Sequence, residues 1–112
     1  MIANSNGFME PETKPLKRLK QLTGVGNIWL YALSIMRKDG KAYAYALDSD
    51  IDKKFGFKPS KVMIYLVLYK LEGEGLIQSK MEDRRKYYHL TEKGKKSLLL
   101  AKKHLGELSK EL

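Results

Sequence analysis

The sequence predicts one small α+β domain, in which several helices are followed by a β-hairpin and then by one more helix. Three observations support this prediction. Hydrophobic residues recur at helical spacing in most segments, glycines and prolines separate these segments, and one short stretch alternates like a strand. A chain of 112 residues can bury one modest core. We therefore expect a single domain over residues 14–112 and a frayed tail over residues 1–13.

Three helices are predicted in the first half of the chain. A short basic amphipathic helix is expected around Leu16–Leu22, and the glycines that follow interrupt helical structure. An almost wholly apolar helix is expected over Asn27–Lys38, with Asn27 as its N-cap. The next helix, about Tyr43–Phe55, is predicted by the four-residue spacing of the apolar side chains Tyr43, Leu47, Ile51 and Phe55.

The second half predicts a helix, a hairpin and a final helix. Ser60 is expected to cap the first of these helices. Leu76–Met81 and Lys86–Leu90 are expected to pair as a β-hairpin, because the second segment alternates in polarity and a charged connector separates the two. Thr91 is expected to cap a helix over residues 92–112. This order of elements is that of a winged helix-turn-helix with a C-terminal dimerisation helix.

Composition restricts the function. Lysine and arginine number 22 against 13 acidic residues, so the formal net charge is +9, which favours nucleic acid as partner before an acidic membrane surface. The chain has no cysteine and two histidines, and no catalytic or metal-ligating arrangement stands out, so we expect no enzyme, no metal and no cofactor. No apolar run is long enough to span a bilayer and no secretion signal begins the chain, so we expect a cytoplasmic, nucleoid-associated protein.

Two basic segments are the expected DNA contacts. In the helix after Ser60, Leu68 and Leu71 with Tyr65 are expected to face the core. The opposite face would then meet DNA through Ser60, Lys61, Ile64 and Lys70. The alternative for Lys61 is a solvated charge, and an apolar helix of this kind offers few side chains for reading bases. At the hairpin tip, phosphate contacts are expected from Arg84, Arg85 and Lys86, with a solvated turn as the alternative.

The final helix predicts a dimer. Its apolar residues follow a 3, 4, 3, 4 spacing, which is typical of a coiled-coil seam. The alternative is packing onto its own domain, but a helix over residues 92–112 would be about 30 Å long, more than a small domain can cover. The expected interface residues are Leu98, Ala101, Leu105, Leu108 and Leu112.

Three segments resemble the PadR family of transcriptional regulators. Residues 40–47, GKAYAYAL, are similar to the family pattern G-P-x-H-G-Y-x-I/L, keeping Gly40, Tyr45 and Leu47 but not the Pro, His and second Gly. Residues 65–77, YLVLYKLEGEGLI, resemble Y-P-x-L-x-x-L-E-x-x-G-L-I. Residues 85–94, RKYYHLTEKG, resemble R-K-x-Y-x-L-T-x-x-G. The generic form of the last two patterns also occurs in MarR-like regulators.

The resemblance implies a homodimeric repressor of the short-tailed, single-helix branch, with its wing beside double-stranded DNA, a palindromic operator, and Tyr45 near the DNA. Some members bind planar aromatic ligands at the dimer interface. Because the last helix lacks tryptophan and Trp29 is expected in the core, no small aromatic effector is predicted, although one stays open. Two other functions also stay open: an architectural nucleoid protein with low sequence specificity, and a winged-helix adaptor between proteins.

Overall fold

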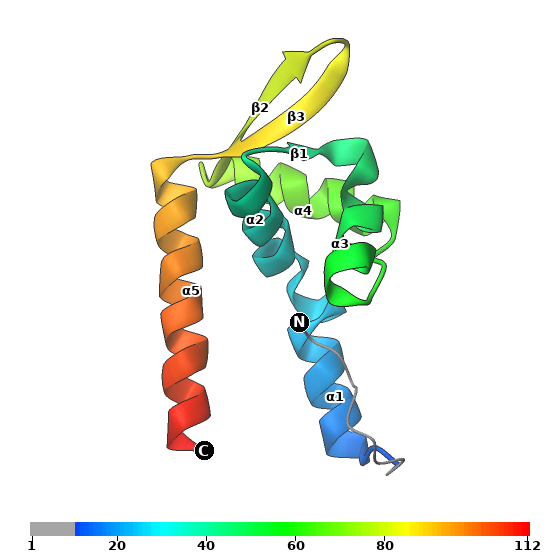
Figure 1. The fold of residues 1–112 in the computed structure, drawn as a ribbon, viewed down its shortest axis with the longest axis vertical. Coiled ribbons are helices and arrows are strands. Elements are labelled where there is room, and N and C mark those ends of the chain that lie inside the picture. The colour runs from blue at the N-terminus through cyan, green and yellow to red at the C-terminus, as the bar shows by residue number, and fades with distance from the viewer. Residues whose placement is uncertain (1–10) are drawn as a thin grey trace.

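The computed structural model describes residues 11–112, which form five α-helices and a three-stranded antiparallel sheet (Figure 1). The α-helices are α1 (Lys14–Thr23), α2 (Ile28–Asp39), α3 (Leu47–Phe55), α4 (Lys61–Gly73) and α5 (Glu92–Glu111). The strands are β1 (Ala42–Tyr43), β2 (Ile77–Glu82) and β3 (Arg85–Leu90), in the spatial order β1-β3-β2. The predicted α+β winged helix-turn-helix is thus confirmed. Residues 1–10 of the expected tail lie outside the described residues, and Thr13 caps α1.

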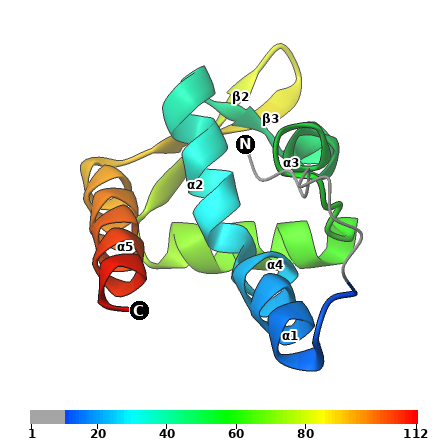
Figure 2. The same cartoon turned by 60° about the horizontal axis from the view of Figure 1, so that its bottom comes forward.

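Helix α2 is the centre of the core. Its buried side chains are Ile28, Tyr31, Ala32, Leu33, Ile35 and Met36, which cover most of its circumference. Such a helix must be surrounded, and Figures 1 and 2 show α3, α4, α5 and the sheet around it. Asn27 precedes α2 as predicted, but its side chain does not cap the helix. It donates to the Leu22 carbonyl and accepts a hydrogen bond from Trp29 Nε1 at 3.1 Å.

The predicted helix over Tyr43–Phe55 begins later, at Leu47. Gly40 ends α2 with φ 86°, a left-handed conformation that glycine adopts readily. The chain then forms β1, in which Ala42 pairs with Tyr88 and Tyr43 with Tyr87. A short 3₁₀ turn, Ala44–Ala46, leads into α3. Tyr43 therefore shares the spacing of the helix but belongs to the sheet, because pairing with β3 satisfies its backbone.

The faces of α4 differ from the prediction in two residues. Ile64, Leu68 and Leu71 are buried, whereas Tyr65 is 45% exposed. The prediction of Ile64 as a DNA contact was therefore wrong, and so was that of Tyr65 in the core. The physical reason is the helical spacing i, i+4, i+7, which places residues 64, 68 and 71 on one stripe. Ser60 caps the helix as predicted, because its Oγ accepts from the Met63 amide at 3.1 Å.

The hairpin is longer and tighter than predicted. Its strands extend to Glu82 and Arg85, which pair with each other, so only Asp83 and Arg84 form the turn. Both have positive φ, 50° and 66°, as a two-residue type I′ turn requires. Arg84 therefore lies at the tip of the wing.

The start of α5 is fixed to the hairpin. Thr91 caps the helix by accepting from the Gly94 amide at 3.1 Å, as predicted, and its own hydroxyl donates to the Gly75 carbonyl at 2.6 Å. Leu98 is only 2% exposed within this chain. The prediction of Leu98 as an interface residue was therefore wrong, because the first turns of α5 pack against α2. Within residues 11–112, no helix is long and apolar enough to cross a membrane.

Candidate nucleic-acid interface

The helix-turn-helix pair consists of α3 and α4, and one lysine joins them. Lys61, in the first turn of α4, donates from Nζ to the Tyr45 carbonyl at 2.8 Å and to Asp48 Oδ1 at 3.2 Å. Its ammonium also lies 4.0 Å from the centre of the Tyr45 ring, a cation–π distance. The Lys61 ammonium is thus engaged by three groups of the protein, although 44% of its side chain remains exposed to solvent.

Asp48 is the buried partner of this lysine, with 4% of its surface exposed. Burial raises the pKa of Asp48, but hydrogen bonds from Lys61 and from the Ser49 amide outweigh it and hold the pKa below its ordinary value. The carboxylate is therefore charged and depends on Lys61. Lys61, which the sequence predicts as a DNA contact, is therefore the counterion of the buried Asp48 carboxylate.

The outer face of α4 is apolar. The stripe opposite the core residues consists of Val62, Leu66 and Tyr69, and Tyr65 lies on its flank. Val62 is 77% exposed and Tyr69 is 78% exposed. The sequence interpretation missed these residues, although the spacing of residues 64, 68 and 71 would have placed them outside. Lys70, the remaining predicted contact on α4, is exposed in the last turn.

The wing carries the predicted basic residues in exposed positions. Arg84 is in the turn, while Arg85 and Lys86 begin β3. The guanidinium carbon of Arg85 lies 5.2 Å from the centre of the Tyr43 ring, and Lys86 Nζ lies 5.5 Å from that of Tyr88. Cations on aromatic rings are held in place yet keep donors for phosphate oxygens.

A row of tyrosines connects the wing to the helix-turn-helix. The ring centre of Tyr43 lies 6.1 Å from that of Tyr45 and 5.5 Å from that of Tyr87. Lys41 Nζ stands 4.2 Å from the Tyr87 ring centre and 2.6 Å from Glu82 Oε1. A side-chain hydrogen bond from Lys41 holds the pKa of Glu82 below its ordinary value. Tyr45, predicted near DNA, is 59% exposed and begins this row.

A second connection joins the end of α4 to the wing. Glu72 Oε2 accepts from the Ser79 amide at 3.0 Å and from the Ser79 hydroxyl at 2.7 Å. These hydrogen bonds lower the pKa of Glu72. The glutamate of the motif residues 65–77 therefore fixes β2 to α4 and does not face a ligand.

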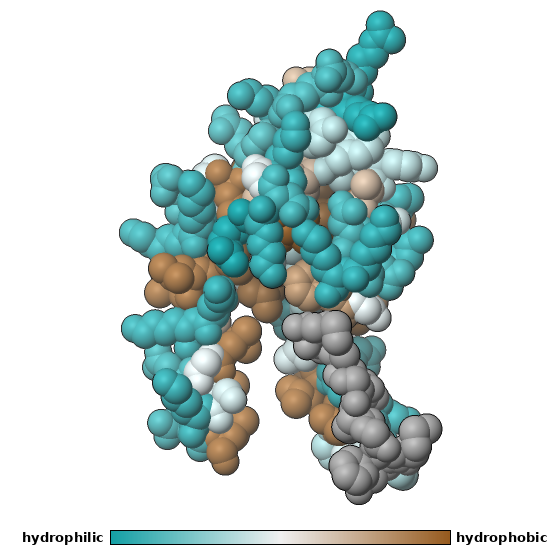
Figure 3. Space-filling view, in the orientation of Figure 1, coloured by the Kyte–Doolittle hydropathy of each residue, from teal (hydrophilic) through white to brown (hydrophobic). Residues whose placement is uncertain are grey.

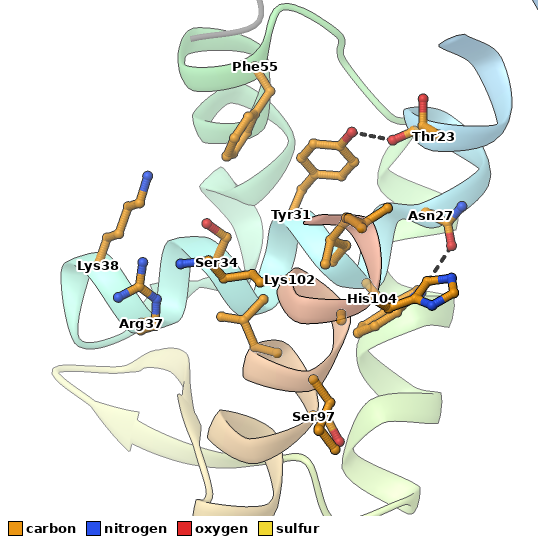
Figure 4. Close-up of a pocket in the computed structure, with 16 residues that line it drawn as sticks. Thr23, Asn27, Tyr31, Ser34, Arg37, Lys38, Phe55, Ser97, Lys102 and His104 are labelled. Carbon is orange, nitrogen blue, oxygen red and sulfur yellow. Dashed lines mark hydrogen bonds between the residues drawn. The ribbon is translucent and has the colours of Figure 1, made fainter. Parts of the chain in front are cut away.

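Two of the predicted dimer residues, Ala101 and Leu105, line an open groove. The groove, about 940 Å³, lies between α2 and α5 and is lined by Trp29, Leu30, Leu100, Ala101 and Leu105 among others (Figure 4). Trp29 was expected in the core, but it is only partly buried and lines this groove. Leu108 and Leu112 are exposed further along α5.

Helix α1 carries a second apolar stripe. Leu16, Leu19 and Leu22 are all more than 40% exposed. In Figure 3, α1 and the end of α5 project from the same side of the molecule, and their hydrophobic surfaces face the space between them. Both stripes lack a cover within residues 11–112.

No catalytic or metal centre accompanies these surfaces in the part of the chain that the structure describes. No three His, Cys, Asp or Glu side chains within residues 11–112 come together in a way that could hold a metal ion. The surfaces that remain are therefore the apolar face of α4, the cationic wing, and the apolar stripes of α1 and α5.

Comparison with known proteins agrees with this geometry. The family model described as "Transcriptional regulator PadR-like family" matches residues 32–99. A PadR-like transcriptional regulator from Bacillus cereus is 30% identical with TM-score 0.69, and the match covers 82% of this chain and 91% of that one. A PadR family regulator from Clostridium difficile is 28% identical with TM-score 0.69, covering 76% and 93%.

A PadR family regulator from Eggerthella lenta, 24% identical, shows the same fold with TM-score 0.73, and the match covers 87% of this chain and 88% of that one. Among curated proteins, no match was found. The family consists of transcriptional regulators, which confirms the prediction that the chain is not an enzyme. With more than half of its residues matched by the family model, this chain belongs to the PadR-like family of transcriptional regulators.

Proposed function

We propose that this regulator is a homodimeric repressor that binds a palindromic operator through α4 and the wing. The observation that supports the proposal best is the division of its surface. Arginines and tyrosines lie at the wing and beside α4, and uncovered apolar stripes lie on α1 and α5. Figure 1 places the wing at one end of the molecule and the two projecting helices at the other.

A second copy is the proposed cover for the apolar stripes. Two-fold dimers are the commonest assemblies of soluble chains. Such a dimer would place two α4 helices on neighbouring turns of DNA, about 34 Å apart, and would explain a palindromic site. Because each α4 has few polar side chains, pairing two of them also gives a selectivity that one helix lacks. As a repressor the dimer would act by occupying its site on the chromosome.

Selection of bound sequences from a random duplex pool tests the DNA part of the proposal. We expect one palindromic sequence to be enriched. Its affinity should exceed that of random DNA by at least 10³ at a stated salt concentration. Salt-dependent binding without enrichment would instead favour an architectural nucleoid protein. This is the second candidate function, because the apolar face of α4 offers few side chains for reading bases. Absence of DNA binding would favour the protein adaptor.

Sedimentation equilibrium tests the dimer. Leu105→Asp with Leu108→Asp places two carboxylates in the exposed apolar stripe of α5, and should give monomers that lose operator binding. Leu99→Asp with Gly106→Asp is the matched control, because it adds the same charges on the other side of the same helix, where Leu99 is 66% exposed. The control should remain dimeric. A wild-type protein that is monomeric at micromolar concentration would refute the dimer.

A further inference from the structure

The outer stripe of α4 is too apolar to be an ordinary solvent-facing surface. Val62, Leu66 and Tyr69 follow the spacing i, i+4, i+7 directly opposite the buried stripe, and together they expose a valine, a leucine and a tyrosine side by side. Contiguous exposed apolar surface of this kind indicates a binding partner. In a helix-turn-helix, the partner of this face is the floor of the major groove.

The chemistry of this face selects among the four bases. Guanine is read by Arg or Lys, adenine by Asn or Gln and cytosine by Asp or Glu, whereas thymine presents a methyl group that apolar side chains contact. Helix α4, KVMIYLVLYKLEG, contains no Arg, Asn or Gln, and its one acidic residue, Glu72, is held by Ser79. Of its two lysines, Lys61 is held by Asp48 and the Tyr45 carbonyl, and Lys70 lies off the stripe, on the flank of the helix that carries Met63. The thymine methyl is the base feature that remains.

Charge indicates that this stripe meets DNA and not another protein. Lys58 precedes α4 in the chain, Lys61 and Lys70 lie on the helix, and the wing that Glu72 fixes to α4 carries Arg84 and Arg85. An apolar helix face on basic elements fits the methyl groups on a groove floor between two phosphate backbones.

We propose that α4 reads its operator mainly through the C5 methyl groups of thymine, with Val62, Leu66 and Tyr69 as the specificity-determining residues. The inference rests on the proposed function, since it concerns how the same helix selects its site. It predicts operator half-sites with thymines at the positions under the first three turns of α4, and discrimination that depends on methyl groups more than on hydrogen bonds.

Uracil substitution tests this directly, because uracil differs from thymine only by the missing methyl group. The probes are the enriched duplex from the selection and the same duplex with uracil in place of thymine, one position at a time. Each contacted methyl is worth about 0.8 kcal/mol, so each such replacement should weaken binding about fourfold. Thymines outside the contacted positions should tolerate the change.

A protein variant shows whether this stripe is the reader. Val62→Ser with Tyr69→Ser removes two exposed side chains, so the variant should fold, as thermal melting would verify. The comparison uses the duplexes whose single uracil weakens wild-type binding. The variant should bind the thymine duplex about as weakly as the wild type binds these uracil duplexes, and should distinguish thymine from uracil less than twofold. Leu99→Ser, which removes an exposed leucine from α5, is the control and should keep the discrimination.

The outcomes separate this inference from the proposed function. An enriched operator that binds equally well with uracil at every position would overturn thymine-methyl reading and leave the sequence-specific regulator intact. A variant that loses affinity equally for both duplexes would overturn the assignment to Val62 and Tyr69. Failure to enrich any sequence from the random pool would overturn both proposals.

Discussion

Replacing Gly94 with alanine should destabilise the protein more than any other single methyl addition to a glycine of α5. A Cβ at this position would lie 2.0 Å from the Leu76 carbonyl oxygen, whereas real Cβ atoms essentially never come closer than 3.0 Å to another heavy atom. The start of α5 would therefore have to move about 1 Å away from Leu76. Two hydrogen bonds cross this contact, from the Thr91 amide to the Leu76 carbonyl at 3.1 Å and from the Thr91 hydroxyl to the Gly75 carbonyl at 2.6 Å.

The magnitude follows from these contacts. Each hydrogen bond contributes about 1 kcal/mol net, and overpacking costs about 1–3 kcal/mol. We therefore expect Gly94→Ala to lower the free energy of unfolding by about 3–5 kcal/mol, and Tm by roughly 12–40 °C for a domain of this size. Urea unfolding measures the free energy and thermal melting measures Tm, both followed by circular dichroism at fixed protein concentration.

Gly106→Ala is the matched control, because it adds the same methyl group to the same helix where no atom lies within 4 Å of the new Cβ. Alanine is the better helix former, so this variant should be more stable by about 0.5–1 kcal/mol. The two substitutions should thus shift stability in opposite directions. If the free energy of unfolding of Gly94→Ala lies within 0.5 kcal/mol of the wild-type value, the close packing of α5 on Leu76 is not what fixes the helix.

Three further predictions concern the ion pairs and the wing. Lys61→Met should lower both DNA affinity and the free energy of unfolding, the latter by about 1–3 kcal/mol, because Asp48 stays buried without its partner; a purely functional loss, with unchanged urea unfolding, would contradict this. Glu72→Gln should reduce the acid sensitivity of the protein. Because the pKa of Glu72 is lowered, its carboxylate stabilises the fold above the ordinary glutamate pKa of 4.5, and this contribution is lost as the pH falls through the lowered pKa. If the free energies of unfolding of variant and wild type stay parallel below pH 4.5, this prediction is wrong. Arg84→Ala with Arg85→Ala should weaken operator and random DNA alike and make the salt dependence of log K shallower by about 2. The charge-matched Lys103→Ala with Lys110→Ala, in the second half of α5, should leave the slope unchanged. An unchanged slope in the wing variant would mean that its arginines form a solvated turn.

Local signals were sufficient to predict most of the fold. Ser60 and Thr91 cap their helices as expected, since a cap depends only on a hydroxyl and an amide two or three residues away. The hairpin was predicted from alternation, and its turn type was not, because Asp-Arg is not a usual type I′ sequence and the register decided it.

Several differences from the prediction involve residues whose neighbours lie far along the chain. Tyr43 became a strand residue because β3, more than 40 residues away in sequence, pairs with it. Leu98 fits a heptad seam as well as a core position, and only the placement of α2 decides between them. The contact between Lys61 and Asp48, which lies on the preceding helix, has no local signal in the sequence. Spacing within one helix predicts which residues share a face, but not what that face meets.

The long-range contacts that the sequence does not reveal also explain how α4 and the wing, the two proposed DNA-binding elements, act together. Lys61 joins the start of α4 to Tyr45, and the tyrosine row carries the connection through Tyr43 to Tyr87 in the wing. Glu72 joins the other end of α4 to Ser79 in the wing. With α4 and the wing tied together at both ends, their spacing is set before DNA arrives, so less conformational freedom is lost on binding. A helix that relies on weak methyl contacts needs this preorganisation, because those contacts alone cannot offset the cost of ordering a loose wing.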